Sequence, residues 1–170
     1  MAEQHNQDAV ALLKQDHRTV EELFAQFARS SGGGRKEKIS KRICLELSVH
    51  ARIEEEIFYP ACEGKIEEDL LKEAYVEHDG AKVLIAEIMA GGPGDEFYDA
   101  KVKVLQEQIE HHVEEEEKRM DGVFAQARKA GLDMDALGEQ LAARRAELTS
   151  QFETTGVPAP ELTTMDATAV

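Results

Sequence analysis

Two pairs of residues in this chain have the types and the spacing to hold metal ions. Glu54 lies four residues after His50, and Glu116 lies four residues after His112. Residues four apart share one face of an α-helix, so each pair would present an imidazole and a carboxylate side by side. Both are common ligands of first-row transition metals.

His17 and His78 join this set because of the apolar residues around them. A helix in a bundle buries positions spaced three and four apart. In four helical segments these positions are apolar except where they carry histidine or glutamate. They are Val10, Leu13, His17, Val20, Phe24 and Phe27; Ile43, Leu47, His50, Glu54, Ile57 and Ala61; Leu71, Ala74, His78, Ala81, Ile85 and Ile88; and Val102, Leu105, Ile109, His112, Glu116, Met120 and Val123. A bundle would bring the histidines into one layer.

Cations would explain why two carboxylates lie on apolar faces. A buried carboxylate without a partner costs several kcal/mol, and the alternative to metal is a buried network of His–Glu hydrogen bonds. Four imidazoles and two carboxylates suit iron or manganese better than structural zinc, magnesium or calcium. With two histidines per metal and both glutamates bridging, an oxygen bridge and open positions remain. We expect two iron ions in an oxo- or hydroxo-bridged pair, with manganese less favoured.

The other two histidines are expected at the surface. His111 shares its helical face with Val104, Gln108 and Glu115, which form a mostly polar strip, whereas His112 lies on an apolar one. His5 precedes the first helix.

Glycine- and proline-rich breaks at 30–34, 60–64, 91–94 and Gly131 separate segments of helical periodicity. The predicted helices cover 7–29, 35–61, 66–90, 96–130 and 133–152. The predicted N-caps are Asn6, Asp95 and Asp133. Long helices with short connections predict an all-α, up-down-up-down four-helix bundle with a shorter fifth C-terminal helix and an irregular tail. The predicted boundaries are 1–130 for the bundle, 131–152 for the added helix and 153–170 for the tail.

Composition excludes some partners. The 170 residues carry a net charge of −15, from 35 acids and 20 bases. Such a chain is a poor ligand for nucleic acid or an anionic membrane surface. The N-terminal residues show no signal-peptide pattern, no apolar run is long enough to span a bilayer, and Cys44 and Cys62 lie too far apart along one helix to bond. We therefore expect a cytoplasmic location.

Four motifs resemble those of the hemerythrin family, in its HHE cation-binding branch, over about residues 8–130. They are Asp16-His17, the run from His50 to Tyr59-Pro60, Glu77-His78 and the run from His112 to Glu117. Asp121-Gly122 stand where the second motif has Tyr59-Pro60, and we expect this departure to let the helix run on.

The resemblance implies a variant with one histidine fewer than the oxygen carriers of that family, which have a His-x-x-x-His pair in the third helix. Here Ala74 and Lys82 lie four residues before and after His78. One metal then lacks a histidine, and Tyr75 is our candidate to fill the gap or to hydrogen-bond a bound ligand. The alternative for Tyr75 is a packing role.

A ferritin-like di-iron bundle is the main alternative to this family, and it uses Glu-x-x-His pairs. The residues three positions before the inward histidines are Lys14, Leu47, Tyr75 and Ile109. None is glutamate, so the ferritin-like interpretation is rejected.

Three functions remain open at this stage. The favoured one is catalase-like decomposition of hydrogen peroxide, because open coordination positions favour redox turnover. The second is non-enzymatic binding or sensing of dioxygen, nitric oxide or iron, for which the fifth helix, with Arg144-Arg145, could dock on the bundle or on a protein partner. The third is a metal-free interaction protein.

Overall fold

The computed structural model describes residues 7–166, and the regular elements among them are helical. In chain order they are α1 (Ala9–Arg29), α2 (Gly33–Ile53), the π-helical turn η1 (Glu54–Phe58), α3 (Tyr59–Cys62), α4 (Glu68–Ala90), α5 (Tyr98–Glu117), α6 (Val123–Lys129) and α7 (Met134–Thr155). None of these helices combines the length and the apolar character that crossing a membrane requires.

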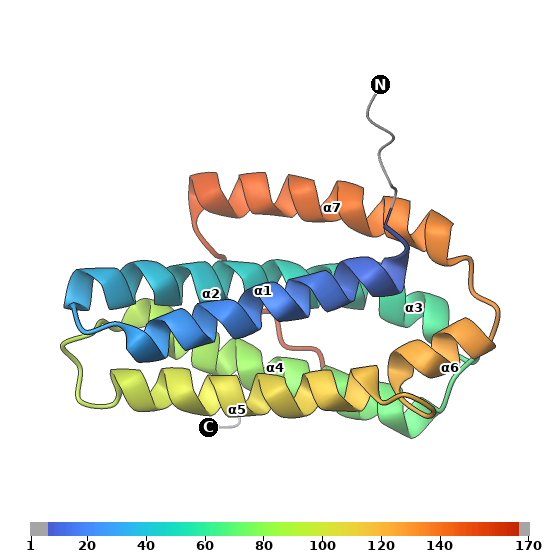
Figure 1. Ribbon diagram of the computed structural model, residues 1–170, viewed down its shortest axis with the longest axis horizontal. Coiled ribbons are helices and arrows are strands. Elements are labelled where there is room, and N and C mark those ends of the chain that lie inside the picture. The colour runs from blue at the N-terminus through green and yellow to red at the C-terminus, as the bar shows by residue number, and fades with distance from the viewer. Residues whose placement is uncertain (1–6, 167–170) are drawn as a thin grey trace.

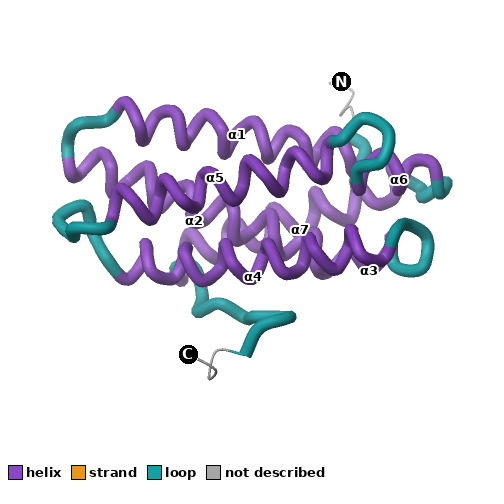
Figure 2. The backbone as a smooth tube through the Cα atoms, turned by 90° about the horizontal axis from the view of Figure 1, so that it is seen from below, coloured by secondary structure: helices purple, strands orange, loops and turns teal. Residues whose placement is uncertain are grey.

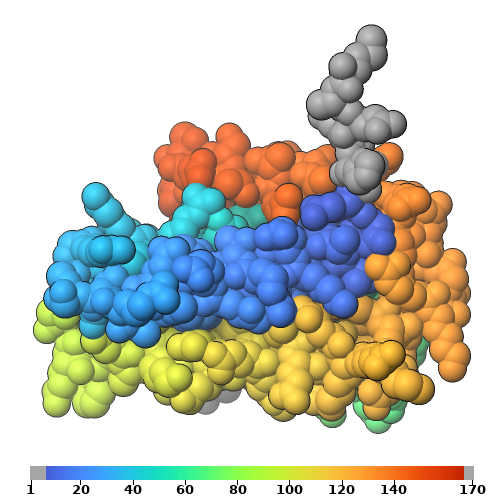
Figure 3. Space-filling model, in the orientation of Figure 1, coloured from blue at the N-terminus to red at the C-terminus, as the bar shows by residue number. Residues whose placement is uncertain are grey.

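The long helices form the expected bundle (Figure 1). Helix α1 packs against α2 and α5, and α4 packs against the same two helices. Around the bundle the order is therefore α1, α2, α4, α5. Helix α7 lies outside this ring, across α1 and α2, and forms the upper layer of the space-filling view (Figure 3). The predicted all-α bundle with an added C-terminal helix is confirmed.

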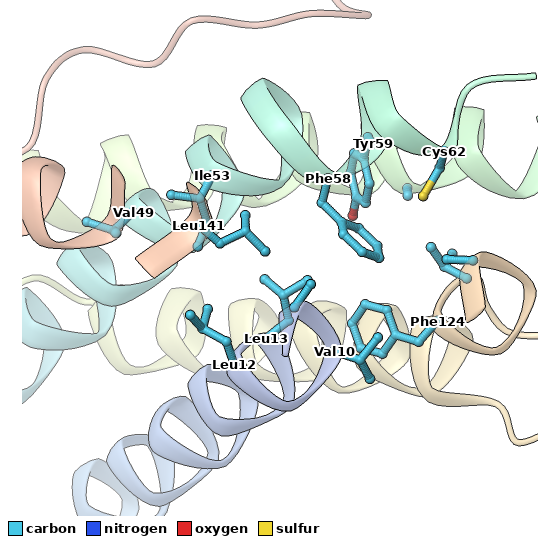
Figure 4. Close-up of a cluster of buried hydrophobic side chains, with 14 of the residues drawn as sticks. Val10, Leu12, Leu13, Val49, Ile53, Phe58, Tyr59, Cys62, Phe124 and Leu141 are labelled. Carbon is cyan, nitrogen blue, oxygen red and sulfur yellow. The ribbon is translucent and has the colours of Figure 1, made fainter. Parts of the chain in front are cut away.

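Two apolar clusters fill the bundle on either side of its middle. One joins the start of α1 to the π-turn, α6 and α7, and includes Leu13, Phe58 and Leu141. Figure 4 shows Phe58 and Tyr59 pointing inward, toward Val10 and Phe124. The other cluster joins the far half of α1 to α2, α4 and α5. The predicted inward positions of α1 and α4 are all buried.

The second predicted helix, over 35–61, contains a π-turn that periodicity did not reveal. A π-turn contains one residue more than a regular helical turn. The side chains that follow it are therefore rotated about the helix axis. Beyond Glu54 the buried side chains are therefore Phe58, Tyr59 and Cys62, while Ile57 and Ala61, which were predicted to face inward, are only half-buried. The rotation carries Tyr59 into the middle of the bundle.

The prediction of one continuous helix over 96–130 is wrong. Helix α5 ends at Glu117, and α6 begins at Val123. Between them Gly122 lies so close to the preceding turn that an added Cβ would be 2.7 Å from backbone atoms of Glu116 and Lys118. The break leaves Met120, predicted to face inward, 83% exposed.

The caps agree with the sequence only in part. Asp133 caps α7, as predicted, by accepting a hydrogen bond from the Ala136 amide at 3.0 Å. Asp95 does not cap α5, whose N-cap is Phe97. Asp8 caps α1, and the predicted cap Asn6 lies outside the described residues.

The close approach at Gly122 predicts a stability difference between two glycine-to-alanine substitutions. Gly122→Ala should lower the free energy of unfolding by about 1–3 kcal/mol, because the new methyl group overpacks against backbone. Gly92→Ala is the matched control, since a Cβ there meets nothing within 4 Å. Urea denaturation measures both, and equal stabilities for the two variants would contradict the close approach.

Candidate metal centre

The histidines and glutamates selected from the sequence meet in one buried layer in the middle of the bundle. Their exposed fractions range from 0 to 5%. Each element of the ring contributes: His17 from α1, His50 from α2, Glu54 from η1, His78 from α4, and His112 and Glu116 from α5.

Four of these side chains converge on one point. The Nε2 atoms of His17 and His50 are 3.1 Å apart. His17 Nε2 lies 3.3 Å from Glu116 Oε2, and His50 Nε2 lies 3.3 Å from Glu54 Oε1. Ligands at about 2.1 Å from one metal ion, at right angles, are about 3 Å from each other. These four residues could therefore hold one cation.

A second group lies beside the first. His78 Nε2 is 3.2 Å from His112 Nε2 and 3.1 Å from Glu54 Oε2. His112 Nε2 is 3.4 Å from Glu116 Oε1. The ligand atoms of Glu54, His78 and His112 could hold another cation. Each glutamate thus turns one oxygen toward each group.

Two carboxylate oxygens support the assignment of the first group as a cation site. Glu54 Oε1 and Glu116 Oε2 are buried and have no hydrogen bond from the described residues. Both belong to the first group. An ionised oxygen buried without a donor is costly, and a bound cation would remove that cost.

Every histidine of the layer has a carboxylate at its outer nitrogen, Nδ1, and in each case the carboxylate comes from a neighbouring helix. The Nδ1–oxygen pairs are His50 with Asp16 at 3.3 Å, His78 with Glu55 at 3.0 Å, His112 with Glu77 at 2.6 Å and His17 with Glu117 at 2.7 Å. A carboxylate only accepts, so Nδ1 donates and a neutral imidazole keeps its Nε2 lone pair facing inward. Sequence analysis assigned these acids no role, although each is adjacent to a candidate ligand.

Helix α7 reaches the layer through one of these acids. Arg145 Nη1 donates to Asp16 Oδ1 at 2.5 Å, while the other Asp16 oxygen faces His50. Arg144 binds Glu56 at 2.7 Å. The arginine pair therefore docks α7 on the bundle, which was one of the two expected options.

Tyr59 is the site residue that sequence reasoning missed. Its hydroxyl donates to Glu116 Oε1 at 2.6 Å and lies 3.2 Å from Glu54 Oε2. The same oxygen is 3.2 Å from His78 Nε2 and 3.4 Å from His112 Nε2, within the second group. The only signal in the sequence was its place in the second motif, because the π-turn that directs it inward has no periodicity signature.

Tyr75 has the packing contacts that were the alternative expected for this residue. Its ring packs edge-on against the Tyr59 ring, with centroids 5.2 Å apart, and it is half-buried at the margin of an apolar cluster. The gap beside His78 is taken by the Tyr59 hydroxyl instead. His111 lies at the surface, as expected, with its side chain 63% exposed.

Comparison with known proteins agrees with this geometry. The family model of the hemerythrin HHE cation-binding domain matches residues 8–122. The chain belongs to this family. The crystal structure of a hemerythrin HHE cation-binding domain-containing protein from Mycobacterium kansasii is similar, with a TM-score of 0.74 and 21% identity over 88% of this chain and 94% of that one. That likeness shows the fold.

One curated relative carries a different description. A DNA nickase from Nostoc sp. is 28% identical to this hemerythrin domain protein over 109 residues. The match covers 64% of this chain but only 31% of the nickase.

The buried histidines and glutamates of this hemerythrin domain shift one another's pKa values. Burial lowers the pKa of the His112 imidazole, but the carboxylates of Glu116, Glu77 and Glu54 together outweigh burial and raise that pKa to about 10. Facing carboxylates likewise outweigh burial at His17 and His50 and raise the pKa of each. Burial raises the pKa of Glu54, yet the imidazoles outweigh it and lower that pKa to about 2. At neutral pH His50 and His112 therefore hold protons that a bound cation would have to displace.

The raised pKa values of the buried histidines predict that metal binding releases protons. The raised pKa values mean that the metal-free protein carries protons on His50 and His112 at pH 7. Apparent metal affinity should therefore rise between pH 6 and pH 8, by about tenfold per pH unit for each proton displaced. Metal titration in weak buffer with a pH indicator measures the release. Uptake without proton release, or affinity that falls with rising pH, would contradict it.

Proposed function

We propose that the chain binds two iron ions and decomposes hydrogen peroxide in a catalase-like reaction. The observation that carries the proposal is the pair of adjacent ligand groups that share Glu54, with the second oxygen of Glu116 lying 3.4 Å from His112 Nε2. This arrangement suits two metal ions held close together, since the shared negative charge reduces their mutual repulsion. Mixed imidazole and carboxylate donors, without thiolate, favour iron.

The redox chemistry would come from the metals. When bound, a pair of iron ions would supply the redox change: two electrons for the reduction of one peroxide to two waters, returned when a second peroxide is oxidised to dioxygen and gives up the two protons that the waters need. The imidazoles of His17, His50, His78 and His112 would hold the ions through Nε2, and Glu54 and Glu116 would span them.

The surrounding side chains would supply positioning and a proton. The Tyr59 hydroxyl, which donates to Glu116, is the nearest O–H group to both carboxylates and could hold a proton beside the second group. Burial raises the pKa of Tyr59 well above its usual value, so this oxygen keeps its proton at neutral pH in the absence of a cation.

The alternative function is non-enzymatic binding or sensing of dioxygen, nitric oxide or iron. One observation favours it, namely the path of contacts from His50 through Asp16 to Arg145 on the outer helix α7. A change at the layer could reach the surface along this path. The nickase activity named for the Nostoc protein is not part of the proposal, because a chain of net charge −15 is a poor ligand for a polyanion.

Oxygen evolution from peroxide tests the proposed reaction. Protein loaded with two iron ions should release dioxygen faster than an equal amount of free iron. His50→Ala should lose metal and this activity while the helical circular dichroism is retained, and His111→Ala, at an exposed position, should change neither. A stable, reversible adduct with dioxygen and no turnover of peroxide would favour the binding function. Retention of both irons by His50→Ala would contradict the assigned site.

The position of Tyr59 generates a separate prediction. Tyr59→Phe should weaken binding of the second metal equivalent by about 10–100-fold, because Glu116 loses its donor and the second group loses an oxygen. Tyr75→Phe is the matched control and should bind both equivalents normally. Competition with a chelator measures the two affinities. If Tyr75→Phe gave the larger loss, the role expected from the sequence would replace the one argued from the structure.

A further inference from the structure

A chamber of about 620 Å³ extends outward from the histidine layer. Its inner end is lined by His17, His50, His78 and His112. It passes between α2 and α4, where its wall includes Ala51 of α2 and Ala86 of α4. Its outer wall is the segment that follows α7, residues 157–163, which lies outside α4 in Figure 2. The chamber thus connects the candidate centre with the C-terminal part of the chain.

The C-terminal segment is held firmly over this chamber. Gly156, with φ of +84°, turns the chain out of α7, a conformation that favours glycine. The buried carboxylate of Asp79 then accepts hydrogen bonds from the backbone amides of Thr163 and Thr164 at 3.0 and 2.6 Å, and from that of Met165 at 3.1 Å. Lys82 binds the carbonyl oxygen of Glu161 at 2.9 Å. These hydrogen bonds fix the segment in place as the outer wall of the chamber.

The chamber is too large for the small ligands of the proposed function. One water occupies about 30 Å³ of liquid volume, and hydrogen peroxide or dioxygen is not much larger. A volume of about 620 Å³ lies within the range of pockets that bind small organic molecules, about 300–1,000 Å³.

The residues that line the chamber determine which chemical class of ligand would bind in it. Between the histidines and the opening the wall is mainly apolar, with side chains such as Leu47, Ile85, Ile109 and Leu162. The arginine and the lysine of the lining are already paired within the protein. Arg52 binds the Glu161 carboxylate at 2.9 Å, and Lys82 binds Glu55 at 2.8 Å. An anionic ligand would have to compete with these acids, so a neutral one is favoured.

We propose that this chamber is a binding site for a neutral, mainly apolar organic molecule, which lies between α2 and α4 under the segment 157–163 with one end at the histidine layer. The inference goes beyond the proposed peroxide chemistry, because binding depends on the walls of the chamber and not on the metals. It assigns the C-terminal segment a role as the outer wall of a ligand site.

Two fluorescent probes of the same aromatic skeleton test the site. N-phenyl-1-naphthylamine is neutral, and 8-anilino-1-naphthalenesulfonate adds one sulfonate. The full chain should bind the neutral probe saturably, at about one per chain, and the sulfonate at least about tenfold more weakly. The titration is repeated on metal-loaded and metal-depleted protein.

Matched variants locate the binding. Ala86→Phe fills the chamber and should weaken the neutral probe at least about tenfold, whereas Val83→Phe, on the same helix at a position 43% exposed and outside the lining, should bind normally. If Ala86→Phe does not fold, Leu162→Asp places a charge in the outer wall without touching a helix. Its control is Val104→Asp, at a position of α5 that is 44% exposed and outside the lining.

The outcomes separate this inference from the proposed function. Saturable binding that Ala86→Phe or Leu162→Asp weakens supports the chamber as a ligand site, whether or not iron is present. Absence of saturable binding, equal binding of the sulfonate, or equal binding by each variant and its control would overturn the inference. Such a result would leave the iron and peroxide measurements unaffected.

Discussion

The structure depends on burying four imidazoles and two carboxylates in the middle of a helical bundle. In that position each polar atom needs a partner, because the side chains are almost wholly buried. The outer nitrogens are satisfied by acids from neighbouring helices, and the inner nitrogens and carboxylate oxygens face one another at ligand distances. The apolar clusters lie on either side of this layer, so it is enclosed at both ends.

The two irregular places in the bundle both lie next to the shared glutamates. The π-turn begins at Glu54 and carries Tyr59 into the layer, and α5 ends one residue after Glu116. Irregular turns of this kind often lie at functional sites, where they redirect a side chain that a regular helix would point elsewhere. Regular helices thus supply the histidines and Glu116, whereas the π-turn supplies Glu54 and carries the Tyr59 hydroxyl into the layer.

Much of the fold and the site was predictable because burial in a helix repeats every three to four residues. That rule placed His17 and His78 inward without any motif. It failed at Tyr59, since the rule assumes 3.6 residues per turn, and it failed beyond Glu117, where a close backbone contact at Gly122 decides the path. The acids at the outer nitrogens were not found, because each serves a histidine on another helix, so its partner is not its neighbour in sequence. The chamber also depends on such long-range packing.

The acids follow a pattern that bears on the handedness of the bundle. In α1 and α4 the acid precedes the histidine, as in Asp16-His17, whereas in α2 and α5, which run the opposite way, it follows the glutamate, as in Glu54-Glu55. In right-handed helices these opposite offsets rotate the acid to the same side when all four are viewed from one end. Each acid therefore points to the next helix around the circle. If the four helices followed one another around the bundle in the opposite direction, every acid would lie on the side away from its histidine. The position of each acid, one residue before or after a ligand, therefore favours one of two mirror-related topologies.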